Sequence, residues 1–294
     1  MSAVVYVNGT ISGASTASIP VFDHGFLYGE GVYETLRTYQ LEPFLFDRHM
    51  RRLRRSSALM ALPVPLTDAE FLARVRDTMA AHPEPDEKYI RILLTRGVGE
   101  LSYQLEATPT PTLVIIVKPL PVISERSFTD GILLSVVSIR RNHPQALNPM
   151  IKSNNLLNNA LAMQEALRAG ADEALMQNQA GEFVECSQSN VFFVRDGAAL
   201  TPPLSAGLLP GITREFVMEL AADVGIPARE ARITPADLDT MDEVFITGTT
   251  REVTPVTTID GRPVGTGRPG PITLRLLAHL RERIGSRSAT RRQG

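Results

Sequence analysis

The chain has 294 residues, of which 43% are hydrophobic and 21% are charged, and its 30 basic and 32 acidic residues leave a formal charge of -2 at pH 7. This composition is typical of a soluble globular protein long enough to form two domains. The balanced charge argues against nucleic acid or an anionic membrane surface as a partner, and no apolar run approaches the roughly 18 residues that a membrane helix needs. We therefore expect small-molecule partners.

The N-terminal segment and the rare residue types narrow the class further. Residues 1–13 have no basic flank followed by an apolar core, so we expect a cytoplasmic protein rather than a secreted one. The single cysteine, Cys186, excludes an internal disulfide, and the five histidines form no pair with metal-binding spacing. We expect no metal site.

The first 120 residues mix strands and helices. Branched and aromatic residues predict strands at 4–7, 31–39, 89–95 and 112–118. A helix is expected from about Asp47, with Met50, Leu53 and Leu59 on one face. Prolines after Lys118 predict a domain boundary near residue 120, which gives a small domain over 1–120 and a linker over 121–131.

The remaining residues predict a larger domain over 132–285 and a disordered tail over 286–294. Strands are expected at 132–139, 173–177, 182–186, 190–194 and 243–247. Helices are expected at about 154–169, from 211–213 onward, and at 271–284. In the first of these helices the residues that recur at helical spacing are Leu156, Ala160, Met163 and Leu167. In the second, the residues expected on the buried side are Phe216, Val217, Leu220, Ala221 and Val224. The predicted fold class is α+β (mixed α/β).

Two segments of the larger domain could hold an anion through backbone amides. One is Leu209-Pro-Gly-Ile-Thr-Arg at a helix start, although Pro-Gly before a helix is more often only a turn, and the other is the turn 248–250. No nucleotide-binding glycine motif is present, so a phosphate would belong to another kind of molecule. Lys152 could form an imine with a carbonyl if it is desolvated, although most lysines are simply solvated.

Longer sequence motifs contain both of these anion-binding candidates and Lys152. Residues 185–193 (ECSQSNVFF), 200–204 (LTPPL) and 207–214 (GLLPGITR) resemble the pattern of class IV aminotransferases, which are pyridoxal 5'-phosphate (PLP) enzymes of fold type IV. Further matches are YGEGVYE at 28–34, HMRRL at 49–53, IKSNNLL at 151–157 and GTTREVTP at 248–255. The resemblance implies a small N-terminal α/β domain and a larger C-terminal domain built on a β pseudo-barrel with helices.

The resemblance also implies roles for individual residues. Lys152 would form the Schiff base with PLP and later move the substrate proton, and Glu185 would face the pyridine nitrogen. The implied cofactor-binding set is Arg52, Lys152, Glu185, Ile212, Thr213, Thr249 and Thr250. Branched-chain aminotransferases often have a tyrosine where this chain has Leu157, whereas D-amino acid aminotransferases have leucine there.

The substrate is indicated by residues of the small domain. Tyr89-Ile90-Arg91 resembles the strand on which branched-chain aminotransferases place an arginine for the side-chain carboxylate of glutamate, although Arg91 could also point to water. The implied substrate-binding set is Tyr28, Tyr33, Tyr89, Arg91 and Thr250. This implies ping-pong transamination of branched-chain L-amino acids (leucine, isoleucine, valine) with 2-oxoglutarate.

Alternatives remain open at this point. A D-amino acid (or R-amine) transaminase is the first, although the arginine and histidine that hold the α-carboxylate in D-amino acid enzymes align with Leu101 and Tyr103. An aminodeoxychorismate lyase, in which cysteines follow the glutamate as Cys186 does here, is the next, and a catalytically idle PLP-binding protein is the last. In this family a loop of the neighbouring subunit, here near residues 98–103, completes the site, so we expect a homodimer or a higher homo-oligomer.

Overall fold

The structure is a computed structural model that describes the backbone of residues 2–291 and the side chains of residues 2–286. The chain forms two compact units. The first unit comprises Met1–Pro121 and Ile151–Asn155, and the second comprises Val122–Met150 and Leu156–Gly294. The short segment 151–155, which contains Lys152, thus joins the first unit although the sequence around it lies in the second.

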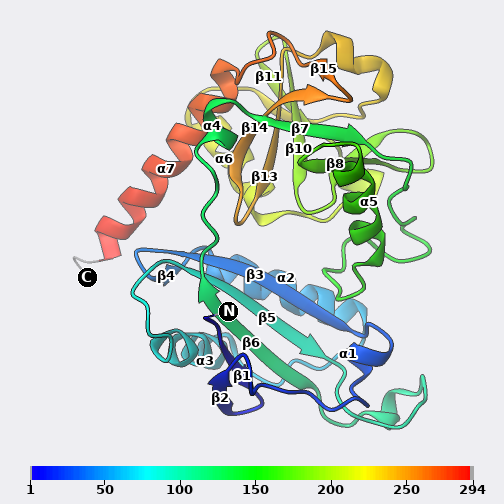
Figure 1. Cartoon of the computed structure of the whole chain (residues 1–294), viewed down its shortest axis with the longest axis vertical. Coiled ribbons are helices and arrows are strands. Elements are labelled where there is room, and N and C mark those ends of the chain that lie inside the picture. The colour runs from blue at the N-terminus through cyan, green and yellow to red at the C-terminus, as the bar shows by residue number, and fades with distance from the viewer. Residues whose placement is uncertain (1, 292–294) are drawn as a thin grey trace. The chain divides into compact units, whose positions relative to one another are not determined.

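The first unit is built on a six-stranded sheet with the strand order β2-β1-β6-β5-β3-β4. Its strands are β1 (Val4–Val7), β2 (Thr10–Gly13), β3 (Gly31–Tyr39), β4 (Glu42–Pro43), β5 (Lys88–Thr95) and β6 (Thr112–Pro119). Its helices are α1 (His24–Leu27), α2 (Phe46–Leu59), α3 (Asp68–Ala80) and the 3-10 turn η1 (Leu105–Ala107). Helix α2 contacts β3, and α3 contacts β1 and β6 (Figure 1).

Residue alternation divides this sheet into two faces. Val32, Leu36, Ile90 and Ile92 are fully buried and form one core with Met50 and other residues of α2 and α3. Because strand side chains alternate between faces, Tyr33 and Arg91 point to the opposite side. The sheet therefore has one apolar face, which the helices cover, and one face that carries polar and aromatic side chains.

Most elements expected in the first unit are confirmed. Strand β3 has the expected bounds, and α2 begins one residue before the expected start. Met50 and Leu53 are buried as expected, but the expectation for Leu59 was wrong: it lies at the C-terminal end of α2 and is 51% exposed. Helix α3 was not predicted, although Thr67 and Glu70 form a capping box at its start.

The second unit is built on a nine-stranded sheet with the order β12-β11-β10-β13-β14-β7-β8-β9, to which β15 adds beside β14. Its strands are β7 (Ile132–Val136), β8 (Glu173–Gln177), β9 (Phe183–Cys186), β10 (Asn190–Arg195), β11 (Ala198–Thr201), β12 (Ala228–Glu230), β13 (Glu243–Gly248), β14 (Glu252–Ile259) and β15 (Arg262–Pro263). Its helices and 3-10 turns are α4 (Arg126–Thr129), α5 (Leu157–Arg168), η2 (Leu204–Ala206), α6 (Ile212–Asp223), η3 (Pro235–Thr240) and α7 (Pro271–Arg291). The end strand β9 also contacts β10, so the sheet curls into a half-barrel.

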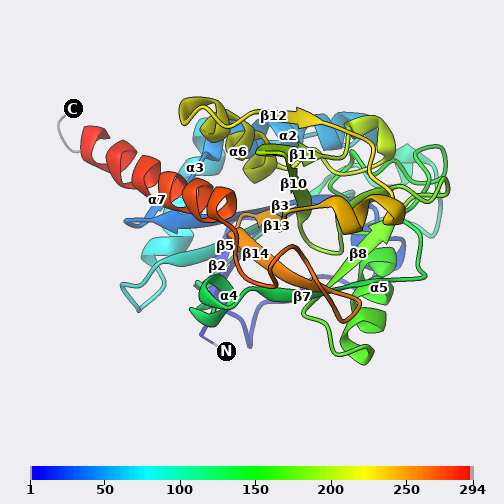
Figure 2. The same ribbon diagram turned by 90° about the horizontal axis from the view of Figure 1, so that it is seen from above.

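Helices cover this sheet on its outside. Helices α6 and α7 contact each other and β13, and α7 also contacts β14 (Figure 2). The expected strands at 173–177 and 190–194 are confirmed as β8 and β10, and the predicted mixed α/β class is confirmed. Short helix α4 lies within the segment that we expected to be a linker.

The helices of the second unit differ from the sequence-based expectations in two respects. In α5 the buried residues are Ala162 and Ala166, whereas Leu167 is 57% exposed. The two alanines lie with Ala174 and Met176 of β8 in one cluster, because small side chains let the helix backbone approach the sheet closely. Residues 286–291, expected to belong to a disordered tail, are helical in α7, and 292–294 lie outside the described residues.

In α6, Phe216, Val217, Leu220 and Ala221 are buried as expected, and Val224 is half-buried. None of the helices within the described part of the chain is long and apolar enough to span a membrane.

Candidate active site

The backbone of Lys152 is held on two sides within the first unit. The Tyr33 amide donates to the Lys152 carbonyl at 2.9 Å, and the Lys152 amide donates to Ser56 Oγ of α2 at 3.2 Å. The Asn154 amide donates to the Gly31 carbonyl at 2.8 Å. Segment 151–155 thus runs antiparallel to the start of β3, which fixes the direction in which the Lys152 side chain leaves the backbone.

The Lys152 side chain meets an aromatic ring and a second cation. Its Nζ donates to Tyr33 Oη at 3.3 Å and lies 4.3 Å from the centre of the Tyr33 ring. The guanidinium of Arg91 lies 4.0 Å from the same ring centre. Burial alone would raise the pKa of Tyr33, but the positive charges of Lys152 and Arg91 lower it below its usual value. Predicted residues Lys152, Tyr33 and Arg91 are therefore brought together.

Lys152 differs from the other two lysines of this chain, Lys88 and Lys118. Lys88, the first residue of β5, is only 2% exposed, and its Nζ lies 3.2 Å from His82 Nδ1. Lys118 Nζ lies 4.9 Å over the ring of Tyr89. Among the described residues, neither amine forms a hydrogen bond with a side-chain hydroxyl as Lys152 does with Tyr33.

Arg52 forms a buried ion pair on the helix-covered side of β3. Its Nε and Nη2 donate to the two carboxylate oxygens of Glu34, both at 2.7 Å, and His49 Nδ1 lies 2.7 Å from Glu34 Oε2. Burial alone would raise the pKa of Glu34, but the charge and hydrogen bonds of Arg52 and His49 lower it to about 2. Burial, opposed by Glu34, lowers the pKa of His49. Glu34 thus fixes the orientation of the Arg52 side chain.

Arg91 keeps unused hydrogen-bonding capacity. Its Nε is buried and has no hydrogen-bond partner among the described side chains and backbone. A buried donor without an acceptor costs free energy, which an anionic ligand would recover. Arg91 as a whole is half-buried, and its guanidinium lies over the Tyr33 ring.

The two remaining tyrosines of the predicted site lie in different surroundings. Tyr89 stands on β5 next to Lys118. Tyr28 follows α1, where its ring meets His24 edge-on at 4.8 Å and lies 5.1 Å from the ring of Tyr103. Tyr28 thus contacts Tyr103 in the exposed loop around residues 98–105.

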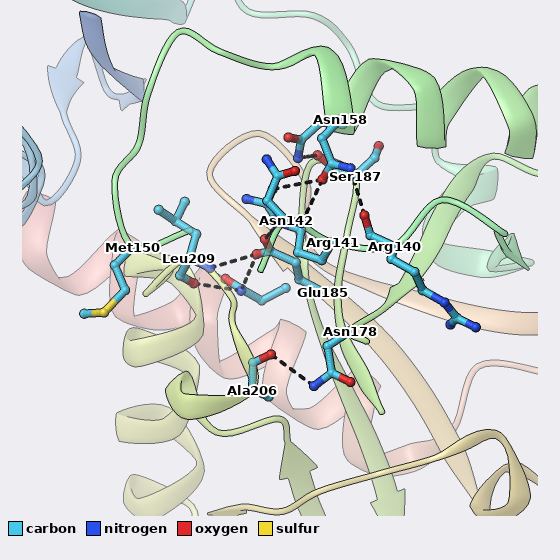
Figure 3. A network of polar contacts seen from close by, with 12 residues as sticks. Arg140, Arg141, Asn142, Met150, Asn158, Asn178, Glu185, Ser187, Ala206 and Leu209 are labelled. Atoms are coloured by element: carbon cyan, nitrogen blue, oxygen red, sulfur yellow. Dashed lines mark hydrogen bonds and ion pairs between the residues drawn. The ribbon is translucent and has the colours of Figure 1, made fainter. Parts of the chain in front are cut away.

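Glu185 is the centre of a polar network in the second unit (Figure 3). Arg141 Nε donates to Glu185 Oε1 at 2.6 Å, and the Leu209 amide donates to Oε2 at 3.1 Å. Asn190 Nδ2 donates to Oε2 at 3.4 Å, and Arg141 Nη1 donates to Asn158 Oδ1 at 3.1 Å. The carboxylate is 5% exposed, so these contacts hold a buried anion in one orientation.

The helix start expected to hold a phosphate offers amides that no side chain caps. Gly211 caps α6 and provides no side-chain acceptor to the first-turn amides, which include those of Ile212 and Thr213. A side chain at position 211 would collide with Asn190, because a Cβ there would lie 1.8 Å from Asn190 Oδ1. The chain therefore requires glycine directly before a group of uncapped backbone amides, an arrangement that suits anion binding.

The turn 248–250 lies beside two buried hydroxyls. Ser189 Oγ and Thr247 Oγ1 are buried and have no hydrogen-bond partner among the described residues. Ser189 Oγ would lie 3.5 Å from a Cβ on Gly248, so it adjoins the turn that carries Thr249 and Thr250. Such unsatisfied hydroxyls suit an oxygen-rich ligand at this end of β13.

The residue after Glu185 has no role in this polar cluster. Cys186 is 1% exposed within the apolar core of the second unit, and burial raises the pKa of its thiol well above the usual value. A protonated, buried thiol is chemically inert. Cys186 therefore gives no support to lyase chemistry that would use this side chain.

Several partners of the site were not foreseen from the sequence. Arg141 lies 44 positions before Glu185, outside any recognisable motif, and Glu34 becomes a partner only because β3 packs against α2. Ser56 lies four residues after Arg52 in α2, on the same side of the helix. That helical spacing was the one sequence signal that could have identified it.

Comparisons with known proteins identify the family of this chain. Residues 31–259 match the family model described as amino-transferase class IV. A "Putative branched-chain-amino-acid aminotransferase" of Methanocaldococcus jannaschii is 40% identical over 272 residues, covering 92% of this chain and 93% of the relative. The D-alanine aminotransferase of Bacillus licheniformis is 33% identical over 285 residues, covering 97% of this chain and 98% of the relative.

A solved structure of another protein is similar to this chain over nearly its whole length. The branched-chain aminotransferase of the thermophilic archaeon Thermoproteus uzoniensis, solved with norvaline, has a TM-score of 0.88 at 35% identity, covering 96% of this chain and 95% of that one. The chain belongs to the class IV aminotransferase family and has its type IV fold. It is therefore a PLP-dependent aminotransferase, and the pinned carboxylate of Glu185 and the uncapped start of α6 suit the ring and phosphate of that cofactor.

Proposed function

We propose that this enzyme transfers the amino group of branched-chain L-amino acids to 2-oxoglutarate by a ping-pong mechanism. The choice of substrate rests on Arg91, a half-buried arginine beside the Tyr33 ring. Its Nε has no hydrogen-bond partner among the described residues. A cation beside aromatic rings can accept the side-chain carboxylate of glutamate or 2-oxoglutarate and can tolerate a leucine side chain.

Lys152 is proposed as the lysine that binds the cofactor. PLP, when bound, supplies an aldehyde for the amine and an electron sink for the substrate Cα. Lys152 Nζ then takes the proton from the Cα of the amino donor in one half-reaction and returns a proton to the Cα of the newly formed amino acid in the other. The hydrogen bonds of the Lys152 backbone to Tyr33 and Ser56 fix the point beside β3 from which this side chain extends.

The remaining cofactor contacts are proposed for both units. Glu185, held by Arg141, would keep the pyridine nitrogen protonated. Arg52 would add its positive charge to the phosphate contacts. The phosphate donors would be the amides of Ile212 and Thr213 with the hydroxyls of Thr249 and Thr250.

The substrate contacts are proposed from the face of the first sheet that the helices leave uncovered. Tyr33 and Tyr89 would border the side chain of the amino acid beside Arg91, and Thr250 with Tyr89 would hold its α-carboxylate. Tyr28 would contribute from the loop region after α1. Its contact with Tyr103 suggests that it acts together with that loop.

A D-amino acid or R-amine transaminase is the second candidate, because D-alanine aminotransferases are among the relatives and Leu157 matches them. The side chains at the positions of their carboxylate-binding pair argue against it. Leu101 is 66% exposed and Tyr103 is 84% exposed, and neither carries a charge. Leu101 offers no hydrogen-bond donor and Tyr103 offers a single neutral hydroxyl, so the pair lacks the positive charges that an arginine and a histidine bring to a carboxylate.

The same loop region supports a homodimer or a higher homo-oligomer. Phe22 and Phe26 are 52% and 67% exposed, next to the exposed Leu101 and Tyr103. The Gly99 amide donates to the Phe22 carbonyl, so the two loops lie side by side. An apolar patch of this kind typically marks a protein interface, and light scattering should give twice the mass of one chain or more.

A panel of amino donors tests the proposed substrate. The purified enzyme is loaded with PLP, and its visible absorbance is followed while L-leucine, L-glutamate, D-alanine and an R-amine are added in turn. The lysine-bound absorbance should disappear with L-leucine and with L-glutamate and persist with D-alanine. Loss with D-alanine alone would reject the proposed substrate in favour of the second candidate.

A further inference from the structure

Tyr33 and Lys152 lie opposite each other in a short antiparallel pairing. The neighbouring bridge joins Val32 to Ser153, and the Tyr33 amide donates to the Lys152 carbonyl. Side chains of directly opposed residues in such a pair project from the same face and lie within contact distance. The backbone pairing therefore places the Lys152 and Tyr33 side chains on the same face, and in the structure the Lys152 amine lies beside the Tyr33 ring.

The Lys152 amine makes its polar contact with Tyr33. Tyr33 Oη, at 3.3 Å, is the one hydrogen-bond acceptor of Nζ among the described residues, and no carboxylate among them pairs with Lys152. The same amine lies 4.3 Å from the ring centre, within the range of a cation–π contact. Tyr33 thus binds Lys152 three times, through its amide, its hydroxyl and its ring.

The charges around this pair come from three elements. Arg91 on β5 lies 4.0 Å from the ring centre, and Glu34 on β3 is bound by Arg52 and His49 of α2. The two cations lower the pKa of Tyr33 and Glu34 opposes them. The Tyr33 hydroxyl accepts the hydrogen bond of Lys152, Arg91 lies over the Tyr33 ring, and Glu34 is already bound by its own partners.

We propose that Tyr33 is a positioning residue for Lys152, whose hydroxyl and ring hold the lysine amine whenever that amine is not bonded to the cofactor. The proposal rests on the proposed role of Lys152 in cofactor binding. During part of both half-reactions of transamination this amine is not bonded to the cofactor, and a free amine on a flexible side chain must stay where it can accept and return a proton. Tyr33 supplies the acceptor and the ring.

Chemical labelling of the three lysines tests the contact without substrate or cofactor. The full chain, freed of cofactor, is treated with trace deuterated acetic anhydride at pH 8, and the modification of Lys88, Lys118 and Lys152 is measured by peptide mass spectrometry. In Tyr33→Phe, which keeps the ring, labelling of Lys152 relative to Lys118 should rise roughly 5-fold, because the ammonium form loses its acceptor. Unchanged labelling of Lys152 would overturn the proposal.

The matched control is Tyr39→Phe. Tyr39 stands on the same face of β3, and its ring lies 4.0 Å from the Arg37 guanidinium. Labelling of Lys152 should be the same in this variant as in the unchanged chain. An equal rise in both variants would show a general loosening of β3 and would overturn the assignment to Tyr33.

Kinetics of the PLP-loaded enzyme separate positioning from substrate binding. Tyr33→Phe should lower kcat in both half-reactions while KM for amino donors stays within about 2-fold. A raised KM with unchanged labelling would assign Tyr33 to the substrate alone. If borohydride fixed the cofactor to another lysine, the proposed function of Lys152 and this proposal would both be refuted, whereas unchanged labelling with the cofactor on Lys152 would refute only this one.

Discussion

The buried ion pair between Glu34 and Arg52 makes a prediction with a definite magnitude and pH dependence. The pKa of Glu34 falls from 4.5 to about 2 on folding. At 1.36 kcal/mol for each unit, the ionised carboxylate stabilises the fold by about 3 kcal/mol at pH 7. Glu34→Gln keeps the size of the side chain and removes the charge, so it should destabilise the chain by about this amount.

The pH dependence follows from the direction of the shift. Because the pKa of Glu34 is lower in the folded chain than in the unfolded one, the stabilisation is complete well above pH 4.5 and disappears as the pH falls toward 2. The difference in stability between the unchanged chain and Glu34→Gln should therefore be constant from pH 7 to about 6, and should shrink by roughly a quarter at pH 4.

Urea unfolding at pH 7, 6, 5 and 4 measures this difference. Asp47→Asn is the control, because Asp47 pairs with Arg51 on the same helix but the two side chains are 69% and 67% exposed. That surface pair should contribute about 0.5 kcal/mol or less. Equal effects of the two substitutions, or a Glu34→Gln effect that does not change with pH, would refute the reasoning about the buried pair.

Three further substitutions test the proposed site. Arg91→Met should raise KM for 2-oxoglutarate and L-glutamate roughly 10- to 100-fold and KM for L-leucine less than about 3-fold, since only the dicarboxylates lose a charge-assisted hydrogen bond. If steady-state kinetics showed the same increase in KM for L-leucine as for the dicarboxylates, this role of Arg91 would be contradicted. Gly211→Ala should weaken PLP binding at least about 10-fold in a fluorescence titration, because the new Cβ collides with Asn190, whereas Gly285→Ala, which meets nothing within 4 Å, should leave it unchanged. Arg141→Met should lower PLP affinity by removing the cation that orients Glu185, and equal affinities in Arg141→Met and in the exposed neighbour variant Arg140→Met would argue against that role.

Local sequence patterns were sufficient for most elements of the fold. The branched and aromatic residues of β3, β8 and β10 specify strands by themselves, and Gly211 with Pro210 marks the start of α6. The buried face of α5 could not be predicted from hydrophobicity. Its buried residues are alanines that permit close packing on β8, while Leu157 and Leu167 stay exposed.

The site was predictable only in part, for a related reason. Motifs indicate residue types at fixed spacing, so Lys152, Glu185 and the start of α6 could be identified. Their partners depend on tertiary pairing over long separations, such as the 119 positions between Tyr33 and Lys152 and the 44 between Arg141 and Glu185. No local pattern specifies that segment 151–155 pairs with β3 in the first unit.

The central claim is that Lys152 carries the cofactor, and the small number of lysines makes a direct measurement possible. The PLP-loaded enzyme is reduced with borohydride, digested, and analysed by peptide mass spectrometry for the lysine that bears the pyridoxyl group. The proposed function predicts the adduct on Lys152, with loss of adduct, visible absorbance and turnover in Lys152→Ala. An adduct on Lys88 or Lys118, or turnover by Lys152→Ala, would contradict it.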